Sequence, residues 1–202
     1  SSAESLLLIL NDILDISKIE SGKFTIDSID FNLRVVLKQQ FDFWINLVTQ
    51  KGLSLKLNVH EPFHECLKGD PNRIKQIISN LISNALKFTK QGNIIIEAST
   101  ELVEDKVELL ISISDTGIGI DKSKQKIIFD AFSQEDLSTT RKYGGTGLGL
   151  TIVSELLKLM HGNIELVSEQ DKGSKFTCRF LLSKGQFQES SFESKVDEKS
   201  HL

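Results

Sequence analysis

Two apolar segments joined by a short polar turn are the feature that most constrains the fold. Residues 93–99 and 107–114 are rich in Ile, Val and Leu, and the polar residues 104–106 lie between them, as is typical of two strands joined by a turn. Residues 163–168 and 175–182 repeat the pattern. Because these strands follow one another and are mixed with helices, we predict an α+β fold. Its two layers would be a mixed, mostly antiparallel sheet and three helices packed on it, preceded by one bundle helix.

Helix-capping residues indicate where helices begin and end. Asn32 can accept a hydrogen bond from the first turn of one helix, and Asp70 followed by Pro71 is a typical start of another. Gly52 is suited to end the first of these two helices. Apolar periodicity predicts helices at residues 5–21, 32–51, 71–88, 121–128 and 151–161. Two further strands are predicted at residues 24–26 and 53–59.

The composition excludes several classes of protein. The chain has 24 basic and 28 acidic residues, so it lacks the basic surplus of a typical nucleic-acid-binding protein. Its longest apolar run, residues 6–10, is far shorter than the about 20 residues of a membrane-spanning helix. The two cysteines are far apart and the four histidines lack metal-ligand spacing. We therefore expect a cytoplasmic chain that itself contacts neither nucleic acid nor a membrane, with the cytoplasmic part of a membrane-anchored protein as an alternative.

The motif Asp-Thr-Gly-Ile-Gly at residues 115–119 follows a predicted buried strand. Its glycines, Gly117 and Gly119, allow the backbone to come close to a flat ligand. The carboxylate of Asp115 can accept a hydrogen bond from an exocyclic amine, which adenine has, whereas guanine presents a carbonyl oxygen at that place. The motif favours an adenine site, although a plain turn after a strand is an alternative.

A second glycine-rich motif, at residues 144–150, precedes a predicted helix. Backbone amides at such a helix start can bind phosphate, with help from the helix dipole. The motif is not a Walker A loop, because no Gly-Lys-Ser/Thr ends it, and its glycine spacing does not match the dinucleotide fingerprint. A phosphate-binding loop and a flexible hinge are both consistent with it.

Asn80, Asn84 and Lys87 share one face of the helix predicted at residues 71–88, because their spacing is i, i+4 and i+7. Amide oxygens can coordinate a Mg2+ ion that bridges phosphates. Lys87 can add a point charge against phosphate. A solvated polar stripe is the alternative interpretation.

Together these motifs resemble the ATP-binding catalytic domain of sensor histidine kinases, in the superfamily shared with gyrase B, MutL and the heat-shock chaperone ATPases. The similar segments are the N box at residues 70–89, the two glycine boxes at 115–119 and 145–150, the F box at 129–132 and the strand that closes the nucleotide site at 173–177. The resemblance covers residues 5–182 and implies the histidine-kinase ATPase fold.

The resemblance also implies a role for single residues. Asp115 would bind the adenine amine, with support from Thr177 through a water molecule. Asn80 and Asn84 would hold Mg2+ on the phosphates of ATP, and Lys87 would contact phosphate.

Residues 121–145 resemble the ATP lid of the family. Arg141 and Lys142 would contact the γ-phosphate side from this lid, and Phe129 and Phe132 would pack its base onto the core. The other residues of the implied nucleotide site are Gly117, Ile118, Gly119, Tyr143, Gly145, Thr146, Gly147, Leu148 and Gly149.

Asn80 distinguishes two classes of enzyme within the resemblance. In gyrase B, MutL and the chaperones, a Glu stands at this position and activates water, but an amide cannot act as a general base. The resemblance therefore implies poor hydrolysis and transfer of the γ-phosphoryl group to a histidine, with catalysis by positioning and charge neutralisation. A free-standing ATPase of the superfamily and a degenerate nucleotide-binding regulatory module are the alternatives.

Residues 1–22 are similar to the second helix of the family's dimerisation hairpin, which implies a homodimer of the full-length protein. The family's phosphoacceptor box is absent from the sequence. We therefore expect the acceptor histidine to lie outside this chain, so that the chain alone does not autophosphorylate. Residues 23–184 would form the ATP-binding domain and residues 185–202 a disordered tail or linker. The implied partner is the receiver domain of a response regulator.

Overall fold

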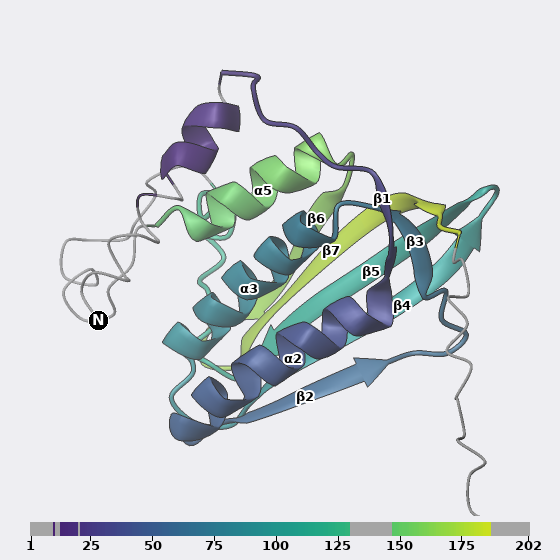
Figure 1. Cartoon of the computed structure of the whole chain (residues 1–202). Coiled ribbons are helices and arrows are strands. Elements are labelled where there is room, and N and C mark those ends of the chain that lie inside the picture. The colour runs from purple at the N-terminus through teal and green to yellow at the C-terminus, as the bar shows by residue number, and fades with distance from the viewer. Residues whose placement is uncertain (1–9, 11–12, 20, 130–146, 187–202) are drawn as a thin grey trace, which may run out of the picture.

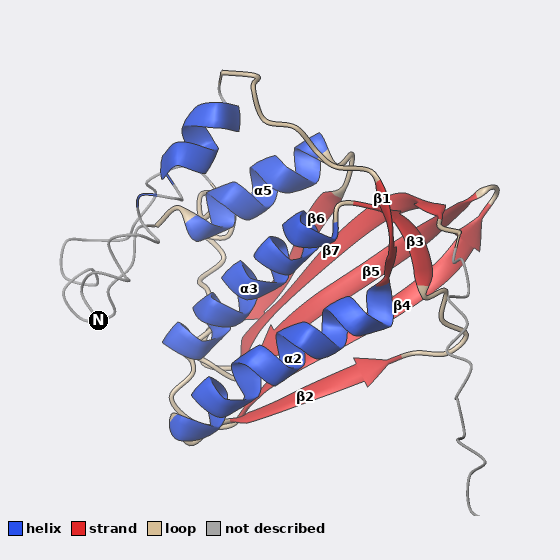
Figure 2. Ribbon diagram, in the orientation of Figure 1, coloured by secondary structure: helices blue, strands red, loops and turns tan. Residues whose placement is uncertain are grey.

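A seven-stranded sheet forms one layer of the molecule, and helices cover one of its faces (Figures 1 and 2). This computed structural model describes residues 10, 13–19, 21–129 and 147–186. The predicted α+β fold with a mixed sheet packed on helices is confirmed. Within the described ranges, no helix has the length and hydrophobicity that crossing a membrane requires.

The sheet has the strand order β1-β3-β7-β5-β4-β2, and β6 pairs with β7 outside this path. Neighbouring strands are antiparallel, except that β2 and β4 are parallel. The strands are β1 (Ile29–Asn32), β2 (Ser54–Val59), β3 (Cys66–Gly69), β4 (Asn93–Val103), β5 (Lys106–Asp115), β6 (Asn163–Glu169) and β7 (Gly173–Lys184). All four strands on which the fold prediction depended are present, as β4 to β7.

The strand predicted at residues 24–26 is wrong. Residues 23–28 have no regular structure, and Phe24 and Ile26 pack against the core without pairing in the sheet. The nearby strands β1 and β3 were not predicted from the sequence. Each has only four residues, which is too short for an alternating pattern to be recognised.

Three helices cover the sheet, and the first two begin at the predicted capping residues. They are α2 (Leu33–Gln50), α3 (Pro71–Phe88) and α5 (Gly149–Leu159). The side chain of Asn32 accepts a hydrogen bond from the Val35 amide at 3.0 Å. The Asp70 carboxylate accepts hydrogen bonds from two amides of the first turn of α3. Gly52 has a φ of 77° just after α2, so it ends this helix in the left-handed conformation that glycine favours.

The short helix predicted at residues 121–128 is wrong, because residues 122–129 form a series of hydrogen-bonded turns. The amides of Lys124 and Ile127 donate to carbonyls three residues earlier, and a single bond from Ile128 to Lys124 has the four-residue spacing of an α-helix. At the end of this segment, Phe129 packs edge-on against Phe176, with ring centroids 6.3 Å apart. The predicted packing of Phe129 on the core is therefore present in the structure.

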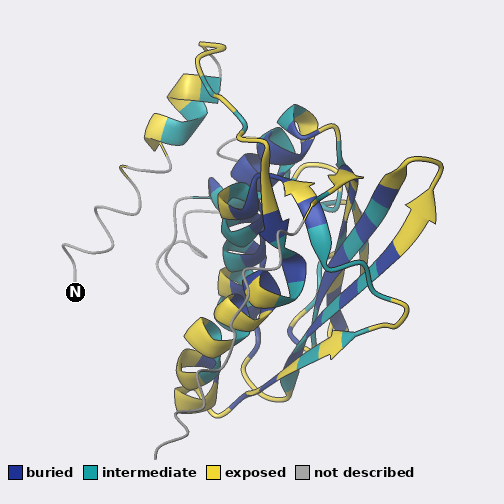
Figure 3. Cartoon of the chain, turned by 45° about the vertical axis from the view of Figure 1, so that its right-hand side comes forward, coloured by how far each residue is buried: buried dark blue, intermediate teal, exposed yellow. Residues whose placement is uncertain are grey.

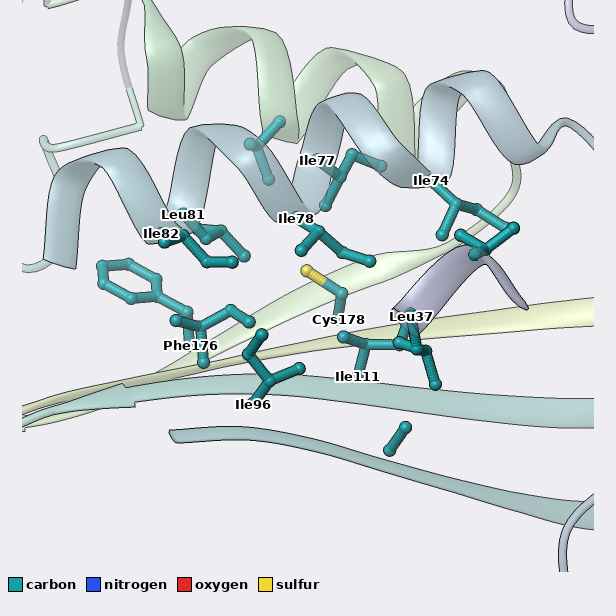
Figure 4. Packing of buried hydrophobic residues seen from close by; sticks show 14 of the residues in the cluster. Leu37, Ile74, Ile77, Ile78, Leu81, Ile82, Ile96, Ile111, Phe176 and Cys178 are labelled. Carbon is teal, nitrogen blue, oxygen red and sulfur yellow. The ribbon is translucent and has the colours of Figure 1, made fainter. Parts of the chain in front are cut away.

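The core lies between the helices and the sheet face that they cover (Figures 3 and 4). Figure 4 shows Ile78 and Ile82 of α3 directed toward Cys178 and Phe176 of β7. All four side chains are buried, and burial raises the pKa of the Cys178 thiol to about 12. Helix α3 is thereby held against the sheet.

Residues 13–19 form a helix before the domain, with one apolar face packed and the other exposed. Ile16 and Ile19 pack against the core, whereas Leu10 and Ile13 are 52% and 47% exposed. The packed face contacts the chain's own domain. Association of two chains through the exposed face stays a prediction.

Polar contacts also hold this helix against α3. Gln76 Nε2 donates a hydrogen bond to the Asp15 carboxylate at 2.8 Å. Arg73 Nη1 donates to the Gln76 side-chain oxygen at 2.9 Å and lies 3.9 Å from Asp15. The Arg73 guanidinium also stacks over the Phe24 ring, 4.3 Å from its centroid. The first turns of α3 therefore anchor the preceding segment.

Replacing Asp15 with alanine is expected to loosen this contact. Asp15 is only 19% exposed, so its hydrogen bond to Gln76 is worth more than a fully solvated one. Amide exchange of residues 13–19 should accelerate about tenfold. The matched control is Asp42→Ala, since Asp42 forms an exposed ion pair with Lys38. Equal exchange rates in the two variants would contradict a stabilising role of Asp15.

Candidate nucleotide-binding site

The carboxylate of Asp115 lies at the end of β5, on the sheet face that the helices cover. Its Oδ1 atom accepts a hydrogen bond from the Gly117 amide at 2.8 Å. Burial raises the pKa of Asp115, while hydrogen bonds from the amides of Gly117 and Ser174 act in the opposite direction. No charged side chain in the described part of the chain contributes to this shift. A half-buried carboxylate with amide donors and no cation beside it is suited to accept a hydrogen bond from an uncharged ligand.

The glycines around Asp115 are required by close packing of the backbone. A Cβ atom added to Gly117 would lie 2.6 Å from the Phe88 carbonyl oxygen. Gly119 and Gly173 have φ values of 64° and 101°, and a Cβ on Gly173 would collide with the Asp115 carbonyl. The sequence argument assigned Gly117 and Gly119 to the approach of a ligand, but in the structure they allow distant segments to meet at the site.

Asn80 and Asn84 lie one turn apart on α3 and face the start of α5. A Cβ atom added to Gly149 would lie 3.6 Å from Asn80 Oδ1 and 3.8 Å from Asn84 Nδ2. The structure therefore brings the second glycine motif next to both predicted metal-binding residues. The Asn80 Nδ2 atom is buried and has no hydrogen-bond partner among the described residues. Such a group is normally paired with water or a ligand.

Lys87 lies one turn beyond Asn84 on the same helix. Burial lowers the pKa of its ammonium group, with no contribution from a charged residue in the described segments. The Nζ atom lies 4.7 Å from the centroid of the Phe88 ring. A half-buried cation without a carboxylate beside it is suited to bind an anion such as phosphate.

Comparison with known proteins places this arrangement in a family. Residues 69–184 match the family described as Histidine kinase-, DNA gyrase B-, and HSP90-like ATPase. The chain belongs to this ATPase family. The predicted resemblance to the ATP-binding catalytic domain of sensor histidine kinases is thereby confirmed.

The relatives of this ATPase domain include named sensor kinases. The sensor histidine kinase GacS of Pseudomonas protegens is 47% identical over 91% of this chain and 20% of its own length. The signal transduction histidine-protein kinase BarA of Escherichia coli is 44% identical over 87% of this chain and 19% of its own length. The chain thus spans about a fifth of each of these relatives.

The fold of the ATPase domain is also found in solved structures. Full-length ShkA, crystallised in complex with AMPPNP, matches with a TM-score of 0.79 and 26% identity. The match covers 92% of this chain and 38% of ShkA.

The structure contradicts the predicted role of Thr177 beside adenine. Side chains alternate along β7, with Phe176 and Cys178 buried and Thr177 on the opposite face of the sheet. There it lines a hollow of about 210 Å³ with Lys175 and other residues of the uncovered face. The sequence argument missed Ser174, whose amide donates to Asp115. The alternation of apolar residues along β7 is the signal by which the sequence could have excluded Thr177 from the adenine site.

The remaining site residues divide between the described and the undescribed parts of the chain. Ile118 is 42% exposed beside Asp115, whereas Leu148 is buried at the start of α5 and Gly147 has a φ of 72°. Most of the predicted lid and part of the second glycine box lie outside the described residues, including Phe132, Arg141, Lys142, Tyr143, Gly145 and Thr146.

Proposed function

We propose that this domain binds ATP and presents its γ-phosphoryl group to a histidine, as part of a sensor histidine kinase. The observation that carries the proposal is the half-buried Asp115 carboxylate beside the C-terminal end of α3, without a cationic partner in the described segments. The similarity to GacS and BarA supports the kinase class. A response regulator receiver domain and a second copy of the full-length protein are the proposed partners.

Asp115 would select adenine by hydrogen bonding. An ionised carboxylate accepts a hydrogen bond from the exocyclic amine of adenine, and this charge-assisted bond is about twice as strong as a neutral one. Guanine would place a carbonyl oxygen against the carboxylate, leaving two acceptors without a donor. The amides of Gly117 and Ser174 orient the carboxylate for this contact.

Asn80, Asn84 and Lys87 would bind the phosphates and Mg2+. The buried Asn80 Nδ2 group has no partner in the described segments and is a hydrogen-bond donor, which supports a contact with a phosphate oxygen. Neutral amide oxygens suit Mg2+ when the phosphates supply most of the charge. When bound, the ion would neutralise part of the phosphate charge. We further propose that Arg141 and Lys142 contact the γ-phosphate from the lid.

The amide at position 80 favours phosphoryl transfer over hydrolysis. A general base must accept a proton, and the Asn80 side chain cannot. No histidine of this sequence has the family's phosphoacceptor context, so the acceptor would come from another segment of the protein. The domain's own contribution is then to hold the nucleotide and exclude the wrong base.

A combined binding and turnover experiment tests this proposal. Calorimetry should detect binding of Mg-ATP to the chain, and Asn84→Ala should remove the part of the affinity that depends on Mg2+. Phosphate release should be at least about 100-fold slower than the roughly 1–10³ s⁻¹ typical of enzymes, and the chain should acquire no acid-labile label from γ-labelled ATP. Rapid hydrolysis would indicate a free-standing ATPase, and absence of binding would indicate a degenerate regulatory module.

A further inference from the structure

Thr89, the residue that follows α3, has a buried hydroxyl that the predicted site does not use. Its side chain is 0% exposed, and its amide ends the helix by donating to the Ala85 carbonyl at 3.0 Å. The hydroxyl oxygen has no hydrogen bond of standard geometry to a described residue. A buried hydroxyl without a partner is unfavourable, so a retained one usually serves a nearby group or an ordered water.

The backbone around Thr89 places this hydroxyl at the adenine side of the site. The Phe88 carbonyl accepts a hydrogen bond from the Ile118 amide at 3.3 Å and lies against Gly117. The end of α3 is therefore joined to the loop that follows Asp115. The Thr89 hydroxyl lies near enough to Asp115 to favour its ionised form and so lower its pKa.

We propose that Thr89 is a positioning residue of the nucleotide site, whose hydroxyl donates a hydrogen bond to the Asp115 carboxylate and orients the oxygen that accepts the adenine amine. This inference rests on the proposed function, because it concerns the same site. With the proposed bond from Thr89, the amides of Gly117 and Ser174 and the hydroxyl would supply three donors to a carboxylate that can accept about four hydrogen bonds. The fourth place is left for the ligand amine.

Charged groups around Asp115 do not compete with this effect. Its neighbours in the sheet are Ile94 on β4 and Ser174 on β7, both uncharged. The packed elements carry Lys87 on α3 and Lys175 on β7, and Lys175 belongs to the opposite face of the sheet. Neither contributes to the pKa of Asp115. A pH-dependent change in adenine binding would therefore report on Asp115 itself.

Two variants of Thr89 separate the effect of the hydroxyl group from the effect of the side-chain shape. Thr89→Val keeps the branched side chain without the hydroxyl, and Thr89→Ser keeps the hydroxyl. Binding of Mg-ADP and Mg-GDP would be measured by calorimetry between about pH 5 and 8. ADP affinity of the wild type should fall as the pH is lowered through the pKa of Asp115, because the protonated carboxyl is a weaker acceptor. In Thr89→Val this fall should begin at a higher pH, because a group that favours the ionised form is gone.

We expect Thr89→Val to bind ADP about tenfold more weakly than the wild type near neutral pH, with little change in GDP affinity. Thr89→Ser should have the ADP affinity and the pH profile of the wild type. Thermal melting of both variants checks the fold, and Thr89→Ala replaces the valine variant if that variant does not fold. A wild type that binds neither nucleotide would refute the proposed function. If the wild type prefers ADP to GDP and Thr89→Val has the same ratio of ADP to GDP affinity and the same pH profile, only the role of Thr89 is overturned.

Discussion

Replacing Asp115 with asparagine is expected to abolish the preference for adenine over guanine nucleotides. The asparagine amide has the same shape, but it can either accept from the amine of adenine or donate to the carbonyl of guanine. The charge-assisted hydrogen bond is lost at the same time. ATP affinity should fall about 10- to 100-fold and GTP affinity should rise toward it. Calorimetry with both nucleotides measures the two constants.

Asp121→Asn is the matched control for this change. The Asp121 side chain is exposed in the segment after the motif and binds only the nearby Ser123 in the described structure. The same chemical substitution there should leave both affinities unchanged. Retention of ATP selectivity by Asp115→Asn would refute the assignment of Asp115 to the adenine amine.

Replacing Gly173 with alanine should have the largest effect on stability. Gly173 has a φ of 101°, which strains any side chain. An added Cβ would also collide with the Asp115 carbonyl and lie 3.0 Å from Thr116 Cα. The backbone of β5 or β7 must then move. We expect the free energy of unfolding to fall by about 3–5 kcal/mol in urea titration, and nucleotide binding to fall with it because Asp115 pairs with Ser174.

Gly52→Ala is the control that separates the cost of a positive φ from the cost of the steric collision at Gly173. Gly52 has a φ of 77°, but a Cβ added there has no atom within 4 Å. The free energy of unfolding of this variant should fall only by the cost of the left-handed conformation, about 1–2 kcal/mol. Its nucleotide affinity should be unchanged. Equal destabilisation by the two substitutions would show that close packing at Gly173 contributes little.

Sequence reasoning succeeded where structure depends on neighbouring residues. Asn32 and Asp70 cap helices through amides two or three residues away, so their effect is contained in a short segment. The spacing of Asn80 and Asn84 puts them on one helix face regardless of what packs against it. The alternation along β7 is local evidence of the same kind, and it would have kept Thr177 out of the predicted adenine site.

Sequence reasoning failed where an element is stabilised by distant contacts. β1 and β3 pair with one another through Ile29 and Gly69, and neither has enough residues to show a period of its own. Residues 122–129 have a helix-like composition, but packing of Phe129 on Phe176 and turn hydrogen bonds determine their conformation. In both cases tertiary contacts outweigh the local preference.

Local sequence patterns predict the chemical groups that are available: a carboxylate after a buried strand, two amides and a lysine on one helix face, and glycines at turns. Which groups surround the carboxylate depends on tertiary contacts. The register of β5 and β7 brings the Ser174 amide to Asp115, and the docking of α3 brings Thr89 there. Side-chain alternation tells which residues share a face, but strand register and helix docking are selected by burial of the whole apolar core. The composition of the proposed adenine pocket therefore depends on the free energy of the entire fold.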